Sequence, residues 1–322
     1  MKVLFVCCGN SKNFDIAPFI KTQGDSLCKR GIELSYFTIN ERGLFGYIRY
    51  SLKLNKYLKN NDVDIIHSHY TLSGWTSVLA FSGKKMVLSL MGSDAYGDFI
   101  GENKRTCKSR FSTLLTYLIQ PFVDKIICKS EHIGSFVLNK KKAIIIPNGV
   151  MLEKVYYNPK GFRKELGMDE NRKYLLFLGN KDDKRKNWIL VERALAIIND
   201  PDYEIIAPYP IDYGKTIKYM NSVDVVVVTS FMEGSPNVVK EAMACNCPVV
   251  ATKVGDIEWL FGDEPGYFLT SFDEKDCADQ IIKAVQYSSE VGKTKGRERI
   301  IQLGLDDETV AERIEKVYKS LM

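Results

Sequence analysis

The stretch VDVVVVTSFMEGSPNVVKEAMACNCPVVAT, residues 223–252, predicts two buried strands joined by a helix. VDVVVV is apolar on both faces, which is typical of a strand in a parallel sheet. We expect Ser235 to cap the helix and Pro236 to occupy its first position, where a missing N–H costs nothing. Pro248 would open the second strand. The stretch therefore predicts a β-α-β unit of an α/β protein.

The loop before this helix predicts a ligand site. Free N–H groups at a helix N-terminus and the positive end of its dipole attract phosphate, and Gly234 lets the backbone approach a ligand closely. Glu233 lies on the loop and Glu241 lies within the helix, and carboxylates accept hydrogen bonds from sugar hydroxyls. A nucleoside diphosphate sugar has a hexose at one end, a ribose at the other and the anion between them. For Glu241 alone, a solvated helix residue is the alternative.

The alternation of apolar runs and amphipathic stretches extends over the whole chain of 322 residues. It predicts two Rossmann-like domains with parallel sheets, because the length exceeds what one core normally covers. We expect an N-terminal domain at 1–155, a C-terminal domain at 156–306, and a last helix at 307–322 that packs back towards the N-terminal domain. Ligands of such sheets bind at the carboxyl ends of the strands, so the two sheets would face a central cleft.

Composition narrows the class of protein. The chain has 45% hydrophobic and 26% charged residues, which is typical of a globular protein. Its eight cysteines include no CxxC pair, so we expect free thiols rather than disulfides. No apolar run approaches the roughly 18 residues of a spanning helix, which predicts a cytoplasmic location. A dinucleotide-dependent oxidoreductase is disfavoured, because no GxGxxG motif follows a strand.

Charge is divided unequally between the two halves. Residues 1–150 contain 21 Lys and Arg against 11 Asp and Glu, a net +10, whereas residues 151–322 contain 24 against 29, a net −5. A basic half without a nucleic-acid-binding motif is compatible with an anionic membrane surface or a lipid phosphate as a partner, but charge alone favours a plain solvated face. The same choice applies to KRTCKSRFSTLLTYLIQPFV, residues 104–123, and to the basic positions of 49–59. Each stretch either touches a membrane or is a helix packed on the sheet.

The segment EGSPNVVKEAMACNCPVVAT strongly resembles the signature of the retaining glycosyltransferases of family 4, which have the two-domain GT-B fold and a Glu-x7-Glu motif. The stretches DIIHSHYTLSGW, VLSLMGSDAYG, IIIPNGV and LFLGNKDDKRKNW fall where such enzymes have comparable segments. The resemblance therefore covers nearly the whole chain. It implies a glycosyltransferase that uses a UDP-, GDP- or dTDP-sugar and needs no metal or other cofactor.

The resemblance also implies roles for particular residues. Glu233 would hold the donor sugar and Lys186 the diphosphate, and these two are the expected catalytic residues. Glu241 would hold the ribose. Further substrate contacts are expected from Gly234, Ser235, Pro236, Asn237, Val238, Gly9, Asn10, Met91, Gly92, Ser93, Asp94, His69 and Asn148.

The chain departs from the family pattern at two positions. Asn180 stands where an Arg is usual, so Lys181, Lys184 or Arg185 would supply the second positive charge. Met91 stands where a His is usual, so any role of that imidazole is absent.

The predicted function is transfer of a hexose, with retention, to a saccharide or a polyprenyl-diphosphate-linked saccharide during assembly of a surface polysaccharide such as capsule, O-antigen or exopolysaccharide. The protein would work in the cytoplasm, peripherally at the inner face of the cell membrane, without a nucleic-acid partner. The two departures leave a non-catalytic sugar-nucleotide-binding or assembly protein of the same fold as the alternative.

Two further motifs resemble metal sites. Asp62-Val63-Asp64 is a DxD sequence, but it precedes a strand, whereas a metal site would lie at a strand's carboxyl end. His67 and His69 project to one face of a strand, and His132 is the only other histidine. We expect a helix-to-strand turn for the first motif and a cleft-lining or packed role for the second.

Overall fold

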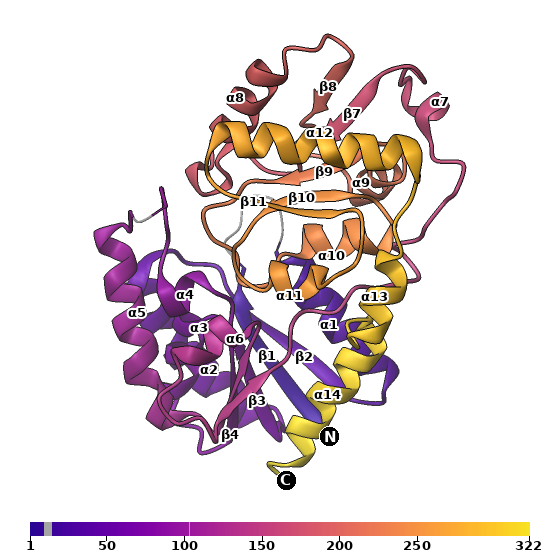
Figure 1. Ribbon diagram of the computed structural model, residues 1–322. Helices are drawn as coiled ribbons and strands as arrows, with labels where there is room; N and C mark the ends of the chain where they lie inside the picture. The colour runs from indigo at the N-terminus through magenta and orange to yellow at the C-terminus, as the bar shows by residue number, and fades with distance from the viewer. Residues whose placement is uncertain (10–14, 103) are drawn as a thin grey trace. The chain divides into compact units, whose positions relative to one another are not determined.

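The computed structural model describes residues 1–9, 15–102 and 104–322, with the backbone alone at 107 and 108. The chain forms two compact units, both visible in Figure 1.

The chain runs between the two units several times. The first unit contains Met1–Gly97, Thr106–Gly149 and Asp307–Met322, and the second contains Asp98–Arg105 and Val150–Asp306. The division after Gly149 lies a little before the boundary expected at 155. The short segment Asp98–Arg105, expected in the N-terminal domain, belongs to the second unit.

The first unit is built on a six-stranded parallel sheet with the order β2-β1-β3-β4-β5-β6. Its strands are β1 (Lys2–Cys8), β2 (Glu33–Ile39), β3 (Ile65–His69), β4 (Lys85–Leu90), β5 (Lys125–Cys128) and β6 (Ala143–Ile145). Strand β1, next to the edge strand β2, pairs Phe5 with Tyr36 of β2 on one side and with His67 of β3 on the other. The order reverses between β1 and β3, and loops at such a point are the usual ligand-binding loops of this fold class.

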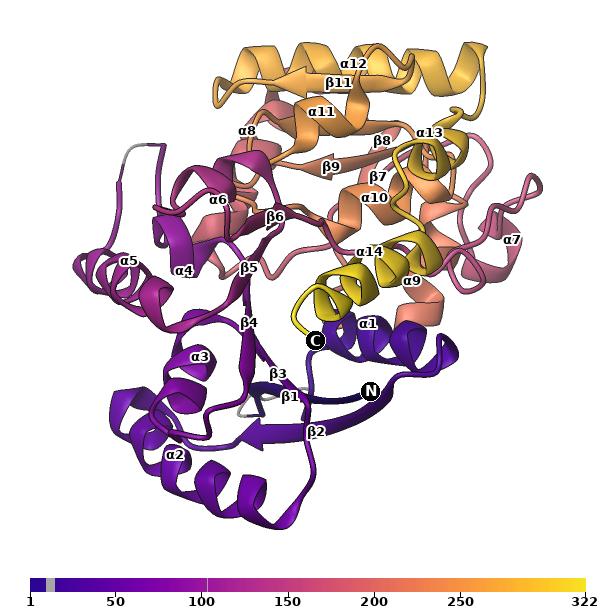
Figure 2. The same cartoon turned by 90° about the horizontal axis from the view of Figure 1, so that it is seen from below.

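Helices cover both faces of this sheet, as Figure 2 shows. They are α1 (Pro18–Lys29), α2 (Gly43–Asn60), α3 (Thr71–Val78), α4 (Ser93–Tyr96), α5 (Cys107–Ile119), η1 (Gln120–Phe122), α6 (Glu131–Ser135) and α14 (Asp307–Lys319). The helices α2, α3 and α5 form a layer on one face, and α1 and α14 lie side by side on the other. The inner strands β1, β3, β4 and β5 are almost fully buried because both faces are covered, whereas the edge strands β2 and β6 are mostly half-buried.

The C-terminal helix α14 completes the core of the first unit. Its residues Ile314 and Tyr318 pack with Phe5 of β1 and Leu27 of α1 in one apolar cluster. Glu315 accepts a hydrogen bond from Arg30 Nε at 2.6 Å, and this charged contact fixes α14 against α1. The last helix of the chain therefore packs on the strands of the first unit and completes their core.

The second unit contains a five-stranded parallel sheet with the order β11-β10-β9-β7-β8. Its strands are β7 (Lys173–Leu176), β8 (Tyr203–Ile206), β9 (Val225–Val228), β10 (Val249–Thr252) and β11 (Tyr267–Thr270). Its helices are α7 (Arg163–Leu166), η2 (Lys184–Lys186), α8 (Trp188–Ile198), α9 (Tyr213–Met220), α10 (Asn237–Ala244), α11 (Ile257–Phe261), α12 (Glu274–Glu290) and α13 (Gly296–Gln302). The order of strands reverses between β7 and β9.

The predicted α/β class with two parallel sheets is confirmed. One local prediction is wrong: Pro236, rather than Ser235, is the N-cap of α10, and the helix begins at Asn237. The side chain of Ser235 instead accepts a hydrogen bond from Lys240. The DxD sequence lies in the turn between α2 and β3, where Asp64 accepts a hydrogen bond from the Lys2 backbone N–H at 2.7 Å.

The seven cysteines whose side chains the structure describes are free thiols, and most of them are buried. Among the described residues, no helix combines the length and the apolar character needed to cross a bilayer.

Candidate active site

In the second unit, Lys186 and Glu233 meet at the carboxyl edge of the sheet. Lys186 ends the short helix η2, and its Nζ lies 2.6 Å from Glu233 Oε1. The same oxygen accepts a hydrogen bond from Ser230 Oγ at 2.8 Å. The two side chains are 31% and 17% exposed, so the ion pair is accessible to a ligand without being fully solvated. The structure thus brings together the two residues expected to be catalytic.

A small pocket lies beside this ion pair. It is lined by Gly179 after β7, by Lys186, by Ser230 after β9 and by Val238 in the first turn of α10. These elements flank the point where the strand order reverses, which is where ligands bind in open parallel sheets. A Cβ atom at Gly179 would lie 2.9 Å from the ring of Phe177 and 3.2 Å from Lys186, so the backbone can pass here only without a side chain. The pocket places a cation, a glycine and a helix N-terminus together.

A second loop supports the Glu233 loop from beneath. Gly255, which follows β10, has φ of +63°. A Cβ atom there would lie 2.6 Å from the backbone oxygen of Glu233 and 2.9 Å from that of Gly234. The position therefore requires glycine for two reasons, its left-handed conformation and the close approach of another backbone. The position of Glu233 depends on this contact.

Lys240 and Asp256 place two buried ionisable groups under the same loop. Lys240 has no exposed surface, and its Nζ donates to Ser235 Oγ at 3.1 Å. Burial lowers the pKa of Lys240 to about 8. Burial also raises the pKa of Asp256 to about 6, although Lys240 holds it lower than burial alone would. Ser235 and Lys240 act electrostatically on the Asp256 carboxylate, but neither makes a hydrogen bond of normal geometry to it.

Glu241 lies further along α10, at the end of the site opposite Glu233. Its Oε1 accepts a hydrogen bond from Tyr213 Oη of α9 at 2.9 Å. Burial raises the pKa of Glu241 to about 7, while the Tyr213 hydroxyl and Lys240 hold it lower. The side chain is only partly exposed. Glu241 is therefore a half-buried side chain with a hydrogen-bond partner, which differs from a fully solvated helix residue.

The basic segment around Lys186 makes several contacts within the second unit. Asn180 is exposed, and its side chain accepts a hydrogen bond from the Asp182 backbone N–H at 3.1 Å. Arg185 is paired with Asp183 at 2.7 Å and with Asp98 at 3.5 Å, and Lys181 lies over the Trp188 ring at 4.1 Å. Each of these cations already has a partner within the unit.

In the first unit, the Met91–Asp94 segment forms a tight loop after β4. Asp94 is fully buried, and its carboxylate accepts hydrogen bonds from the backbone N–H groups of Met91 and Gly92, each at 2.9 Å, and of Thr71 at 3.1 Å. These three contacts make Asp94 the internal brace of the loop. Met91 and Ser93 are partly exposed. Met91 and Ser93 therefore remain accessible to a substrate, whereas the Asp94 carboxylate is buried and bonded within the loop.

His69, expected to contact substrate, is 2% exposed. Its ring lies 4.5 Å from that of Phe5 and stacks on His67 at 4.4 Å. His67 is bonded through one ring nitrogen to Tyr318 Oη at 2.5 Å and through the other to Ser89 Oγ at 2.8 Å. Burial lowers the pKa of both imidazoles well below the usual value. The pair is packed, which was one of the two roles expected for it.

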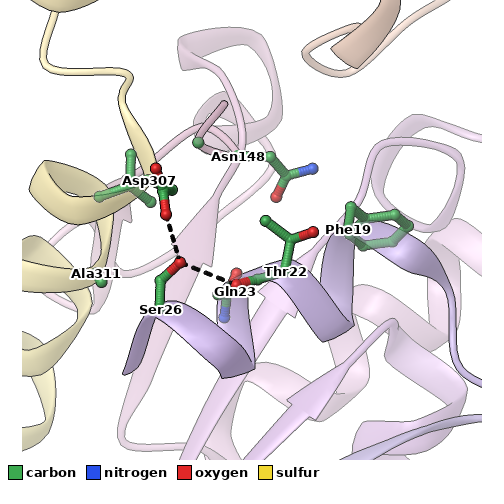
Figure 3. A pocket seen from close by; sticks show the side chains of 9 residues that line it. Phe19, Thr22, Gln23, Ser26, Asn148, Asp307 and Ala311 are labelled. Carbon is green, nitrogen blue, oxygen red and sulfur yellow. Dashed lines mark hydrogen bonds between the residues drawn. The ribbon is translucent and has the colours of Figure 1, made fainter. Parts of the chain in front are cut away.

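The remaining substrate contacts expected in the first unit are Gly9, Asn10 and Asn148. Gly9 follows β1 and donates its N–H to Ile39 at 2.9 Å, while Asn10 lies outside the described residues. Asn148 lines a pocket between α1 and α14, with Thr22, Gln23, Ser26 and Asp307 (Figure 3). Ser26 Oγ donates to Asp307 at 2.8 Å and to the backbone oxygen of Thr22 at 3.0 Å. Asn148 thus lies beside the contact between α1 and α14.

Sequence reasoning missed the groups that support the candidate site. They are Tyr213, Ser230, Lys240, Gly255 and Asp256. Two signals could have revealed some of them. Lys240 stands among apolar neighbours in a helix that is otherwise buried, and Gly255-Asp256 follows a strand that ends at the same edge of the sheet. Tyr213 has no such signal, because its contact joins two separate helices.

Family models match both parts of the chain. Residues 2–154 match a model described as Glycosyltransferase Family 4, and residues 174–287 match one described as Glycosyl transferases group 1. An uncharacterized glycosyltransferase of Methanocaldococcus jannaschii is 28% identical over 273 residues, which cover 79% of this chain and 74% of that protein. The putative teichuronic acid biosynthesis glycosyltransferase TuaC of Bacillus subtilis is 24% identical, with 64% of this chain and 58% of TuaC covered.

Solved structures share the architecture. Sucrose-phosphate synthase from Thermosynechococcus elongatus aligns with a TM-score of 0.83 at 19% identity, covering 99% of this chain and 98% of that chain. Anabaena HepE in complex with UDP and glucose aligns with a TM-score of 0.76 at 18% identity over 100% of both chains. At these identities the likeness shows the fold alone.

Proposed function

Because the chain belongs to the family 4 glycosyltransferases of GT-B fold, we propose that it transfers a sugar with retention of configuration from a nucleoside diphosphate sugar to a saccharide acceptor. One observation carries the proposal: Lys186 and Glu233 form a 2.6 Å pair beside the first turn of α10, at the reversal of strand order. A cation and a helix N-terminus suit a diphosphate, and a carboxylate beside them suits the hydroxyls of the attached sugar.

The proposed chemistry follows from the leaving group. Departure of a nucleoside diphosphate develops negative charge, and Lys186 together with the N–H groups of Asn237 and Val238 would stabilise it electrostatically. This needs no metal ion. Glu233 would orient the donor sugar, and Glu241 would accept hydrogen bonds from the ribose. Glu233 and Glu241 are thus positioning groups at the two ends of one donor and not an acid–base pair.

The relatives support a more specific proposal for the acceptor. TuaC is named for teichuronic acid biosynthesis, and a Campylobacter jejuni transferase, 26% identical over 56% of this chain and 56% of its own length, is named for a diphospho-undecaprenol-linked acceptor. HepE was solved with UDP and with UDP-glucose. We therefore favour a polyprenyl-diphosphate-linked saccharide as acceptor and assembly of a surface polysaccharide as the process, at the cytoplasmic face of the membrane.

The donor is tested by thermal shift with UDP-, GDP- and dTDP-sugars, followed by measurement of nucleoside diphosphate release with the stabilising donor. We expect Glu233→Ala and Glu241→Ala each to abolish or strongly reduce release, whereas Glu192→Ala, an exposed residue of α8, leaves it unchanged. Release unaffected by both site variants would overturn the assignment of this site. An NMR spectrum of the product tests retention, because an inverted anomer would exclude it.

A further inference from the structure

Helix α2 in the first unit exposes a stripe of large apolar side chains. Phe45 is 82% exposed, Ile48 44% and Leu52 74%. Their spacing of three and four residues places them on one face of the helix. The opposite face packs inward through Tyr47, whose backbone oxygen accepts a hydrogen bond from Thr76 Oγ1 of α3 at 2.9 Å, and through the fully buried Leu54. The helix is therefore held firmly while its outer face carries unburied apolar groups.

Basic residues flank this stripe. Helix α2 contains Arg49, Lys53, Lys56 and Lys59, and no Asp or Glu. Glu41, just before the helix, pairs with Arg49 at 3.2 Å and with Lys53 at 3.6 Å. Within the part of the chain that the structure describes, Lys56 and Lys59 have no carboxylate within ion-pair distance. The outer face of α2 thus combines apolar groups with uncompensated positive charge.

Helix α5 of the same layer repeats the apolar pattern. Phe111, Leu114 and Leu118 follow the same spacing and are 52%, 50% and 51% exposed. The inward side of α5 is fixed to α3, because Trp75 Nε1 donates to the Leu115 backbone oxygen at 3.1 Å. Helix α3 contacts both α2 and α5, so the three helices form one continuous layer, visible in Figure 2.

We propose that the outer face of α2, with that of α5 beside it, docks on an anionic lipid bilayer. An amphipathic helix with aromatic and leucine side chains on its outer face and flanking lysines lies in the headgroup plane, where apolar side chains enter the acyl boundary and ammonium groups meet lipid phosphates. A second copy of the same basic face would repel the first, and a nucleic acid would leave the apolar stripe in water. The docking surface is separate from the candidate active site and does not require sugar transfer.

The test is co-sedimentation of the full chain with vesicles of phosphatidylcholine, with and without phosphatidylglycerol. Two double variants address the two components of the surface: Lys56→Glu with Lys59→Glu, and Phe45→Ser with Leu52→Ser. The matched control is Lys275→Glu with Lys283→Glu, which changes net charge equally at exposed positions of α12 in the second unit. Thermal unfolding and release of nucleoside diphosphate report whether each variant folds and keeps its donor site.

We expect wild type to sediment with phosphatidylglycerol vesicles, less so at high salt, and not with phosphatidylcholine alone. Loss of two lysine contacts weakens partitioning by about 30-fold, because each contributes about fivefold near an anionic surface. The serine variant binds at least about tenfold more weakly, and the α12 control binds like wild type. Wild type that stays in solution, or α2 variants that sediment like wild type, would overturn the proposal. So would a concentration-dependent dimer abolished by the serine variant without any vesicle binding.

Discussion

The two units each bury a pair of ionisable side chains near the carboxyl edge of a sheet, but the two pairs have different surroundings. In the first unit, the ring of His69 packs against those of Phe5 and His67. Both ring nitrogens of His67 are hydrogen-bonded, one to Tyr318 and the other to Ser89. In the second unit the pair is Lys240 and Asp256, and Lys240 donates a hydrogen bond to Ser235, two residues beyond Glu233. Burial alone therefore does not identify a site. The second pair matters for function because it supports a loop that carries a partly exposed ion pair.

The buried histidines of the first unit and the buried carboxyls of the second unit respond to pH in opposite directions. The folded first unit keeps His67 and His69 neutral, because burial lowers their pKa values well below the usual range. The folded second unit keeps protons on carboxyls, because burial raises the pKa of Glu241 to about 7 and that of Asp256 to about 6. Falling pH thus lowers the free energy of unfolding through the two histidines and raises it through the two carboxyls. Variants of each pair can separate a packing role from a functional one.

The largest effect is expected at the accessible ion pair. Lys186→Met removes the cation that would meet the leaving diphosphate and leaves Glu233 with Ser230 as its remaining hydrogen-bond partner. Loss of one electrostatic group of this kind lowers kcat by about 100-fold to 1,000-fold. The measurement is steady-state release of nucleoside diphosphate. Lys283→Met, at an exposed lysine of α12, should behave like wild type, and equal losses in the two variants would contradict the assignment.

An intermediate effect on sugar transfer is expected when Lys240, which lies beneath the Glu233 loop, is replaced. Lys240→Met keeps an unbranched side chain one atom shorter but removes the hydrogen bond to Ser235, and we expect kcat to fall by about tenfold as the loop loses an anchor. Wild-type activity should fall as pH rises through about 8, where Lys240 loses its proton.

The pH profile tests whether Lys240 acts by its charge. The methionine variant should lack the decline above pH 8, because it has no ammonium group to titrate. A buried structural lysine could lower kcat when replaced, but it would not remove this limb of the profile. A variant that retains the limb would show that Lys240 acts by packing alone.

Replacing a buried histidine of the first unit should change the stability of the protein and have little effect on sugar transfer. Below the pKa of an unfolded histidine, about 6.5, both histidines bind protons in the unfolded chain but stay neutral in the folded chain. The free energy of unfolding therefore falls with falling pH. His69→Phe removes one such group. Its stability loss between about pH 7.5 and about pH 5.5 should be smaller than that of wild type, by up to about 1.4 kcal/mol.

Denaturant unfolding at the two pH values measures this difference. His132→Phe, at an exposed position, is the control and should show the wild-type pH dependence. If the phenylalanine variant instead lost sugar transfer at neutral pH while its stability was unchanged, His69 would have a functional role and the contrast between the two units would fail.

The fold and the loop that carries Glu233 could be predicted from sequence because each rests on a local pattern, whereas Lys186 is indicated by the family resemblance. VVVV followed by Gly-Ser-Pro marks a buried strand and a helix start, whatever lies elsewhere. The supporting groups could not be predicted in this way. Gly255 matters through its contact with the Glu233 backbone, and Tyr318 reaches His67 across 251 positions in the chain. The burial of His69 cannot be predicted from its position at the end of a strand, because that position is the same whether a neighbouring helix covers it or not.

The smallest effect is expected at the far end of the candidate site. Tyr213→Phe removes the hydroxyl that donates to Glu241 at 2.9 Å and that holds the Glu241 pKa below what burial would give. The Glu241 pKa should rise above about 7, so more of the carboxyl is protonated at neutral pH, and a protonated carboxyl is a weaker acceptor for ribose hydroxyls. We expect KM for the donor to rise about threefold, with kcat unchanged and the effect shrinking at higher pH.

Tyr157→Phe, in the segment before α7, is the control for loss of a tyrosine hydroxyl. A KM effect that disappears at high pH would place Glu241 on the part of the donor that does not react. A fall in kcat with KM unchanged would mean that Glu241 acts on the reacting end, because an interaction made only in the transition state lowers kcat and kcat/KM equally. Glu233 and Glu241 would then address the same end of the donor, and the assignment of hexose to one and ribose to the other would be wrong.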